Sequence, residues 1–133
     1  MREFTLKTER RTQVVNVTEQ VLETLGDPGD AAAALVYVPH TTAGVVIQEH
    51  ADSAVGRDLE MAFERIVDDG WPWEHFEEGE VNPWSHARAA LTASSVVVPI
   101  VGGRLALGTW QGIYVWEHRR RPHRRRCVIH LGS

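Results

Sequence analysis

The sequence contains a single cysteine, Cys127, among its 133 residues. One cysteine cannot form an internal disulfide, so the composition fits a reducing compartment and a fold held together by a buried apolar core. The sequence also lacks an apolar run of about 18 residues, which a membrane-spanning helix needs, and its start lacks the apolar stretch of a secretion signal. These absences predict a soluble, cytoplasmic protein with no membrane partner.

Linkers, repeats and low-complexity segments are absent too, which predicts one domain over residues 1–133. Strand-like runs are numerous and helical patterns separate them, so we expect an α+β domain in which two packed β-sheets carry two or three helices. The expected strands span residues 3–8 and 12–17, forming a hairpin, and residues 31–38, 43–47, 95–101, 105–117 and 127–131. Helices are expected from Thr18, from Asp52 or Ser53 up to Asp68, and after Asn82 and Pro83.

Acidic side chains dominate the first hundred residues, and basic side chains dominate the rest. Residues 1–100 hold 17 acidic and 7 basic side chains, whereas residues 101–133 hold 1 acidic and 7 basic side chains. Six of these seven basic side chains are arginines within residues 119–126. Such a run could bind nucleic acid. It contains no aromatic residue for base stacking, however, and the acidic remainder of the chain would repel phosphates. We therefore predict a solvated hairpin loop and no nucleic-acid partner.

Residues 108–114, GTWQGIY, place two glycines, a tryptophan and a glutamine inside an otherwise strand-like run. Glycine inside a strand usually marks a bulge or a close approach of backbone or ligand. Two interpretations fit: a bulged strand with Trp110 in the core, or a binding surface. In the second, Thr109, Trp110 and Gln111 supply a donor, an apolar wall and an amide, a set suited to a planar or polar ligand.

Three of the seven histidines are candidates for a metal site. His40 follows a buried strand, His75 lies in a loop, and His86 lies near a helix start. Histidine is a common metal ligand, but no pair here has a diagnostic HxxxH spacing, so the spacing alone leaves the site undecided. Surface or strand positions are expected for His118, His123 and His130.

Polar residues beside these histidines are candidates for substrate chemistry. Glu49, on an apolar strand, needs a partner and could orient a histidine or act as a base, while Asp52 serves equally well as a helix cap. The hydroxyls of Thr41 and Thr42 could donate to a phosphate, or the two threonines could be ordinary strand residues.

Several of these segments occur together in an order that resembles the YjbQ family, also called UPF0047 or secondary thiamine-phosphate synthase. They are PHTTAG at residues 39–44, QEHAD at 48–52, EH at 74–75, SH at 85–86 and GTWQG at 108–112. The resemblance implies a homotrimer with a divalent-metal site, zinc or magnesium, formed by His40, His75 and His86. It also implies binding by Thr41, Thr42, Thr109 and Trp110, and catalysis by Glu49, Asp52 and Gln111.

The sequence departs from the family pattern at two places. His50 stands where the family has an amide, and Val81 and Asn82 stand where it has an acidic pair. His50 could be an extra ligand or could simply fill the space.

The hypothesis from this resemblance is a metal-dependent enzyme acting on a phosphorylated small molecule, with a weak or secondary thiamine-phosphate synthase activity and an unknown principal reaction. The alternative is a non-catalytic protein that binds a metal, a phosphate or a nucleotide.

Overall fold

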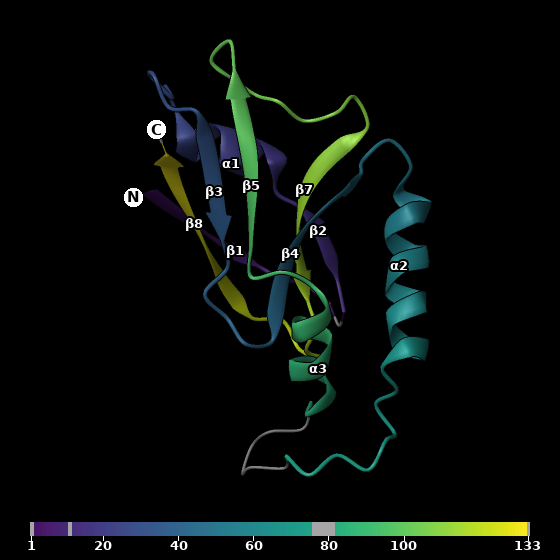
Figure 1. The fold of residues 1–133 in the computed structure, drawn as a ribbon. Coiled ribbons are helices and arrows are strands. Elements are labelled where there is room, and N and C mark those ends of the chain that lie inside the picture. Colours follow the sequence, from purple (N-terminus) through teal and green to yellow (C-terminus); the bar gives the residue numbers. More distant parts are fainter. Residues whose placement is uncertain (1, 11, 76–81, 133) are drawn as a thin grey trace.

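The computed structural model describes residues 2–10, 12–75 and 82–132, which form two antiparallel sheets and three helices (Figure 1). The five-stranded sheet has the order β1 (Arg2–Lys7), β8 (Arg124–Gly132), β3 (Ala33–Tyr37), β5 (Ser95–Val101) and β6 (Arg104–Leu105). The three-stranded sheet has the order β2 (Val14–Asn16), β7 (Gln111–Glu117) and β4 (Ala43–Glu49). The predicted α+β class with two sheets is confirmed.

The core lies between the two sheets because alternate side chains of facing strands point inward. Val36, Val98 and Ile129 from the larger sheet belong to the same buried cluster as Val45 and Val115 from the smaller one. Helix α1 (Thr18–Leu25) adds two further apolar side chains to this cluster, Val21 and Leu25. Cys127 lies there too, and burial raises the pKa of its thiol to about 12.

The other two helices flank the smaller sheet. Helix α2 (Ser53–Ile66) begins where Asp52 accepts a hydrogen bond from the backbone N–H of Ala54, so the predicted cap is confirmed. It stands beside the sheets in Figure 1, and Glu60 is its buried residue. Helix α3 (Trp84–Leu91) follows Pro83 and packs near β4. No helix within the described residues is both long and apolar enough to cross a membrane.

One predicted strand pairing and one predicted continuous strand are wrong. The first two strands do not form a hairpin, because β1 pairs with β8 and β2 pairs with β7, in different sheets. The expected strand over residues 105–117 is broken into β6 and β7, with a turn between them that contains the GTW residues. Local pattern cannot assign partners to a strand, because those partners are set by packing across the whole domain.

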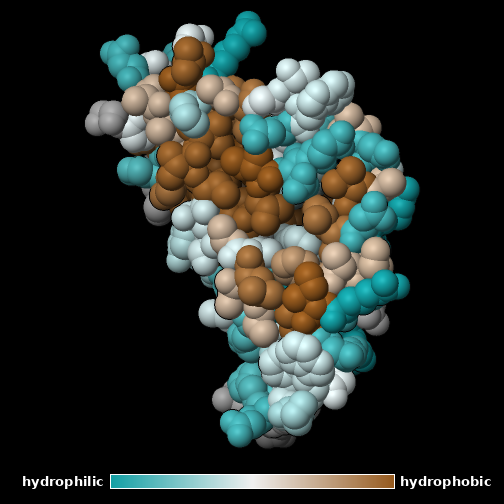
Figure 2. All heavy atoms as spheres, turned by 45° about the vertical axis from the view of Figure 1, so that its right-hand side comes forward, coloured by the Kyte–Doolittle hydropathy of each residue, from teal (hydrophilic) through white to brown (hydrophobic). Residues whose placement is uncertain are grey.

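Strand β5 leaves apolar side chains uncovered. Val97 is 60% exposed and Val101 is 68% exposed, and on the side of β5 away from β3 the described residues pair only at Ile100 and Val101. Figure 2 shows a broad apolar area in the upper half of the molecule, at the level of α1 and the upper part of β5. An uncovered strand edge with an apolar surface is typical of a contact with another chain.

Candidate functional site

The predicted site residues lie at opposite ends of the β4–β7 pair. Ala43 pairs with Glu117 at one end, and Glu49 pairs with Gln111 at the other. At about 3.3 Å per residue, the seven-residue strand separates these ends by about 20 Å. His40 and Thr42 therefore lie far from Glu49 and Gln111, and a single chain does not bring all the predicted residues together.

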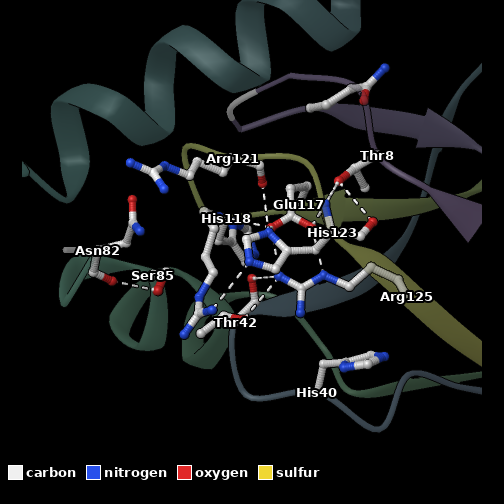
Figure 3. Close-up of polar contacts among 12 residues, drawn as sticks. Thr8, His40, Thr42, Asn82, Ser85, Glu117, His118, Arg121, His123 and Arg125 are labelled. Carbon is white, nitrogen blue, oxygen red and sulfur yellow. Dashed lines mark hydrogen bonds and ion pairs between the residues drawn. The ribbon is translucent and has the colours of Figure 1, made fainter. Parts of the chain in front are cut away.

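A buried ion pair defines the first end. Glu117 on β7 and Arg125 on β8 are joined by two short contacts, Nη2 to Oε1 at 2.5 Å and Nε to Oε2 at 2.6 Å (Figure 3). Both side chains are almost fully buried. Because β7 and β8 belong to different sheets, this pair links the two sheets at that end.

The hydrogen-bonding groups around this pair are already used within the chain. Thr8 Oγ1 and the backbone N–H of Arg119 donate to Glu117, and Arg125 donates to both the carbonyl oxygen and Oγ1 of Thr42. Thr42 is buried, so its predicted role in phosphate binding fits poorly with this geometry, whereas Thr41 is exposed.

His40 has a defined tautomer. Its Nε2 accepts a hydrogen bond of 2.8 Å from the backbone N–H of Arg126, so the neutral ring carries its proton on Nδ1. Burial, followed by the positive charge of Arg125, lowers the pKa of His40. With one nitrogen protonated and the other already an acceptor, the ring has no free lone pair for a metal. His40 is instead placed to donate a hydrogen bond.

His75 and His86 lie together, without His40. Their ring centroids are 5.0 Å apart in an edge-on arrangement, and both line an open pocket of about 620 Å³ with Glu74 and Trp73. Within the described ranges, no three histidine, cysteine, aspartate or glutamate side chains form a metal-binding group. The predicted three-histidine site is therefore not formed within one chain, and the structure places only its His75–His86 pair.

The second end holds the other predicted residues. Glu49 accepts from the backbone N–H of Asp52, and Tyr114 donates to the Glu49 carbonyl oxygen. Gln111 Oε1 accepts from the N–H of Gly108. Thr109 and Trp110 are exposed in the turn before β7, and Trp110 is 62% exposed, so its core interpretation is wrong.

The arginine run is only partly the predicted solvated hairpin loop. The connection from β7 to β8 passes between sheets and is no hairpin, and Arg125 is buried. Arg120 and Arg126 do meet acidic surface residues, Asp69 and Glu3, as expected.

His118 was expected at the surface or on a strand, and it is fully buried instead. Its Nε2 lies 3.2 Å from Thr92 Oγ1, which itself donates to the Ala89 carbonyl, so Nε2 donates and Nδ1 carries a lone pair. Within the described structure Nδ1 has no hydrogen-bond partner. Burial lowers the pKa of His118 to about 3. His130 is exposed on β8, as expected.

Sequence reasoning gave no role to Glu117 and Arg125, the residues that organise the first end. A signal was available, since Glu117 is the one acidic side chain in residues 101–133 and lies two residues before the arginine run. A lone carboxylate at the end of an apolar strand needs a cationic partner if it is buried.

The two antiparallel sheets and three helices define an α+β protein. The model of the UPF0047 protein YjbQ-like family matches residues 2–133, and this chain belongs to that family. UPF0047 protein YugU of Bacillus subtilis is 38% identical over 129 residues, covering 95% of this chain and 94% of YugU. UPF0047 protein YjbQ of Escherichia coli O157:H7 is 35% identical, covering 86% and 85% of the two chains.

Solved structures agree with this assignment. A YjbQ/UPF0047 family protein from Clostridium acetobutylicum has a TM-score of 0.88 and 34% identity, covering 97% of this chain and 98% of that one. A hypothetical protein from Aeropyrum pernix has a TM-score of 0.85 and 37% identity, covering 98% and 97%. The family is one of uncharacterised function, and the names of these relatives state no activity.

Proposed function

We propose that the protein is a metal-dependent enzyme acting on a phosphorylated small molecule. The observation that carries the proposal is the spacing of His75 and His86, whose ring centroids are 5.0 Å apart. With Zn–N bonds of about 2.0–2.1 Å and tetrahedral angles, two imidazoles on one ion place their ring centres about 5 Å apart. The centroid spacing of the pair therefore matches that of two imidazoles on one divalent ion, with zinc preferred and magnesium possible.

The remaining coordination positions leave room for a substrate. Glu74 lines the same pocket, but the described side chains form no three-ligand group, so Glu74 would have to move toward the two rings to become a further ligand. An ion held by few protein ligands keeps positions open for water or a phosphate oxygen, where it supplies Lewis-acid chemistry.

His40 supports the anionic part of the substrate. Its Nδ1–H is a donor, and Arg125, Arg126 and His123 disfavour a positive charge at this ring, whereas Glu117, which is paired with Arg125, favours one. Such surroundings favour a phosphate over a second cation. Thr41, exposed beside His40, is a second donor.

A homotrimer would explain why the predicted residues are divided between two ends. We propose that the uncovered edge of β5 and exposed Trp110 contact neighbouring copies, so that Glu49, Asp52, Thr109 and Gln111 of one copy serve a pocket near the histidines of the next. A weak or secondary thiamine-phosphate synthase activity, with loss of pyrophosphate, remains the reaction that the family resemblance suggests.

Elemental analysis of untagged protein tests the metal proposal. We expect close to one zinc per chain in the unaltered protein, and His75→Ala and His86→Ala should each lose most of it, because a site with few ligands depends on each. His130→Ala, exposed on β8, is the matched control. Full occupancy in both His75→Ala and His86→Ala would overturn the proposal.

The alternative is a non-catalytic metal or phosphate binder. The carboxylate of Glu117 already accepts hydrogen bonds from Arg125, Thr8 and the backbone N–H of Arg119. The first end therefore lacks a free carboxylate base, which favours the non-catalytic binder. Pyrophosphate release from a hydroxymethylpyrimidine diphosphate and a thiazole phosphate, lost in His86→Ala, would favour the enzyme. Metal binding with no turnover of phosphorylated compounds would favour the binder.

A further inference from the structure

His50 is held by the GTWQG turn through two hydrogen bonds. Its backbone N–H donates to the Trp110 carbonyl at 2.8 Å, and its ring Nε2 lies 2.9 Å from the Thr109 carbonyl oxygen. A carbonyl oxygen only accepts, so Nε2 carries the proton and Nδ1 of the neutral ring keeps its lone pair. His50 is therefore fixed as an acceptor, the opposite of His40.

Gln111 is fixed as a donor by the same turn. Its Oε1 accepts the N–H of Gly108 at 2.7 Å, which leaves the side-chain NH₂ group for other partners. Gly112 allows the close packing here, because a Cβ at that position would lie 3.2 Å from His50 Cβ and 3.2 Å from Thr18 Oγ1. The second glycine of the motif thus seats His50 beside Gln111.

Both side chains line one pocket of about 570 Å³ at the start of α1. Among the described residues of the lining, Leu22 is the one apolar side chain, and further polar groups come from Asn16, Thr18, Glu19 and Gln20. A pocket of this size suits a small molecule with a polar group at one end and an apolar body at the other.

We propose that this pocket binds a small molecule through an amide or lactam group. The N–H of that group donates to His50 Nδ1, and its C=O accepts from the Gln111 NH₂. The proposal rests on the proposed small-molecule function and shares Gln111 with the proposed trimer site, but His50 and Gln111 line this pocket within one chain and need no metal at His75 and His86. An asparagine at position 50 could turn its amide to donate or accept, whereas His50 with Nε2 committed accepts only, so this chain selects a ligand that presents a donor.

The first test is the histidine tautomer, read from two-bond ¹H–¹⁵N correlations of the full chain at pH 8. We expect the Nε2–H form for His50 and the Nδ1–H form for His40. The Nδ1–H form at His50 would overturn the proposal.

The second test uses benzamide and N,N-dimethylbenzamide, two probes that differ in the amide N–H. Benzamide should shift the His50 and Gln111 side-chain resonances and bind at least about tenfold more tightly than its dimethyl analogue, the usual scale for one hydrogen bond. Equal binding of the two probes, or no binding of benzamide, would refute the proposal.

Two variants keep the turn intact while removing one partner each. His50→Lys preserves a donor to Thr109 O but has no acceptor, and Gln111→Glu preserves the acceptor for Gly108 N–H but lacks the NH₂ group. Each should weaken benzamide binding by about tenfold, while His130→Lys should not. A loss of zinc in His86→Ala without any change in benzamide binding would separate this proposal from the metal proposal.

Discussion

Glu117 is the residue on which the buried polar contacts of the first end converge. Its carboxylate receives hydrogen bonds from Arg125, Thr8 and the backbone of Arg119, in a position with no solvent access. A buried charge of this kind is tolerated because each oxygen is satisfied. Removing the negative charge of Glu117 would leave Arg125 buried without a counter-charge.

Glu117→Gln should lower the free energy of unfolding by about 3–5 kcal/mol, because Arg125 would stay buried without its counter-charge. Arg126→Gln breaks the Arg126–Glu3 pair, whose side chains are about half exposed, and should cost only about 0–1 kcal/mol. Urea unfolding of the two variants measures both. Similar losses in the two would contradict the assignment of Glu117–Arg125 as the organising pair.

His118 should make stability depend on pH. Its pKa of about 3 in the folded chain lies below the usual 6.5, so between these values the unfolded chain binds a proton that the folded chain does not. Stability from this residue is therefore complete above about pH 6.5 and is lost as the pH falls. His118→Gln keeps a donor for Thr92 and removes the titration.

From pH 7 to pH 5, the unaltered protein should lose about 2 kcal/mol more than His118→Gln, at about 1.4 kcal/mol per pH unit below 6.5. Denaturant unfolding at the two pH values gives the difference. Parallel losses in the two proteins would show that His118 is not the sensitive group.

At the residue scale, the sequence identified candidate site residues, but it could not predict the hydrogen-bonding role of each one. His75 and His86 are paired as candidates for one site, yet His40 is committed to Arg126, an interaction between residues 86 positions apart. Tautomers depend on such distant partners, so spacing alone could not separate the donor His40 from the acceptor His50. The exposure of Trp110 was likewise hidden, because a tryptophan beside glycines fits a core and a surface turn equally well.

At the scale of helices and strands, helix α2 was more predictable from the sequence than the strand pairings were. Its start, length and cap were predictable, since Asp52 and the apolar spacing are local signals. The pairing of β1 with β8 and of β2 with β7 was not predictable, because no local pattern records a partner that lies about a hundred residues or more along the chain. The predicted strand over residues 105–117 failed for a related reason: Gly108 and Gln111 close a turn through their own hydrogen bonds.

Two glycines of these elements should respond oppositely to alanine. A Cβ at Gly44 on β4 would lie 2.0 Å from Thr92 Oγ1, so Gly44→Ala should cost about 1–3 kcal/mol through overpacking. Gly56 on α2 has nothing within 4 Å of such a Cβ, and Gly56→Ala should stabilise by about 0.5–1 kcal/mol through helix propensity. Thermal unfolding compares the pair. A neutral Gly44→Ala would contradict the close contact between β4 and the residue after α3.

At the scale of the whole molecule, the proposed assembly depends on the uncovered side of β5. We expect a homotrimer by native mass spectrometry, and Val97→Lys should shift it to monomer, because a charge on an apolar strand edge opposes edge pairing. Glu23→Lys, exposed on α1, is the control and should leave the mass unchanged. A monomeric unaltered protein at micromolar concentration would refute the shared-site proposal while leaving the His75–His86 pair testable.

Strand β8 lies between β1 and β3, although it is the last strand along the chain. Arg2 pairs with Ile129, so the larger sheet cannot assemble until residues 124–132 are available. Proteins dominated by such distant pairings fold in about milliseconds to seconds, much more slowly than helical bundles. During synthesis, the apolar faces of β1 and β3 therefore stay exposed until β8, which lies between them in the sheet, has been made. Before β8 emerges, this chain is at its greatest risk of aggregation.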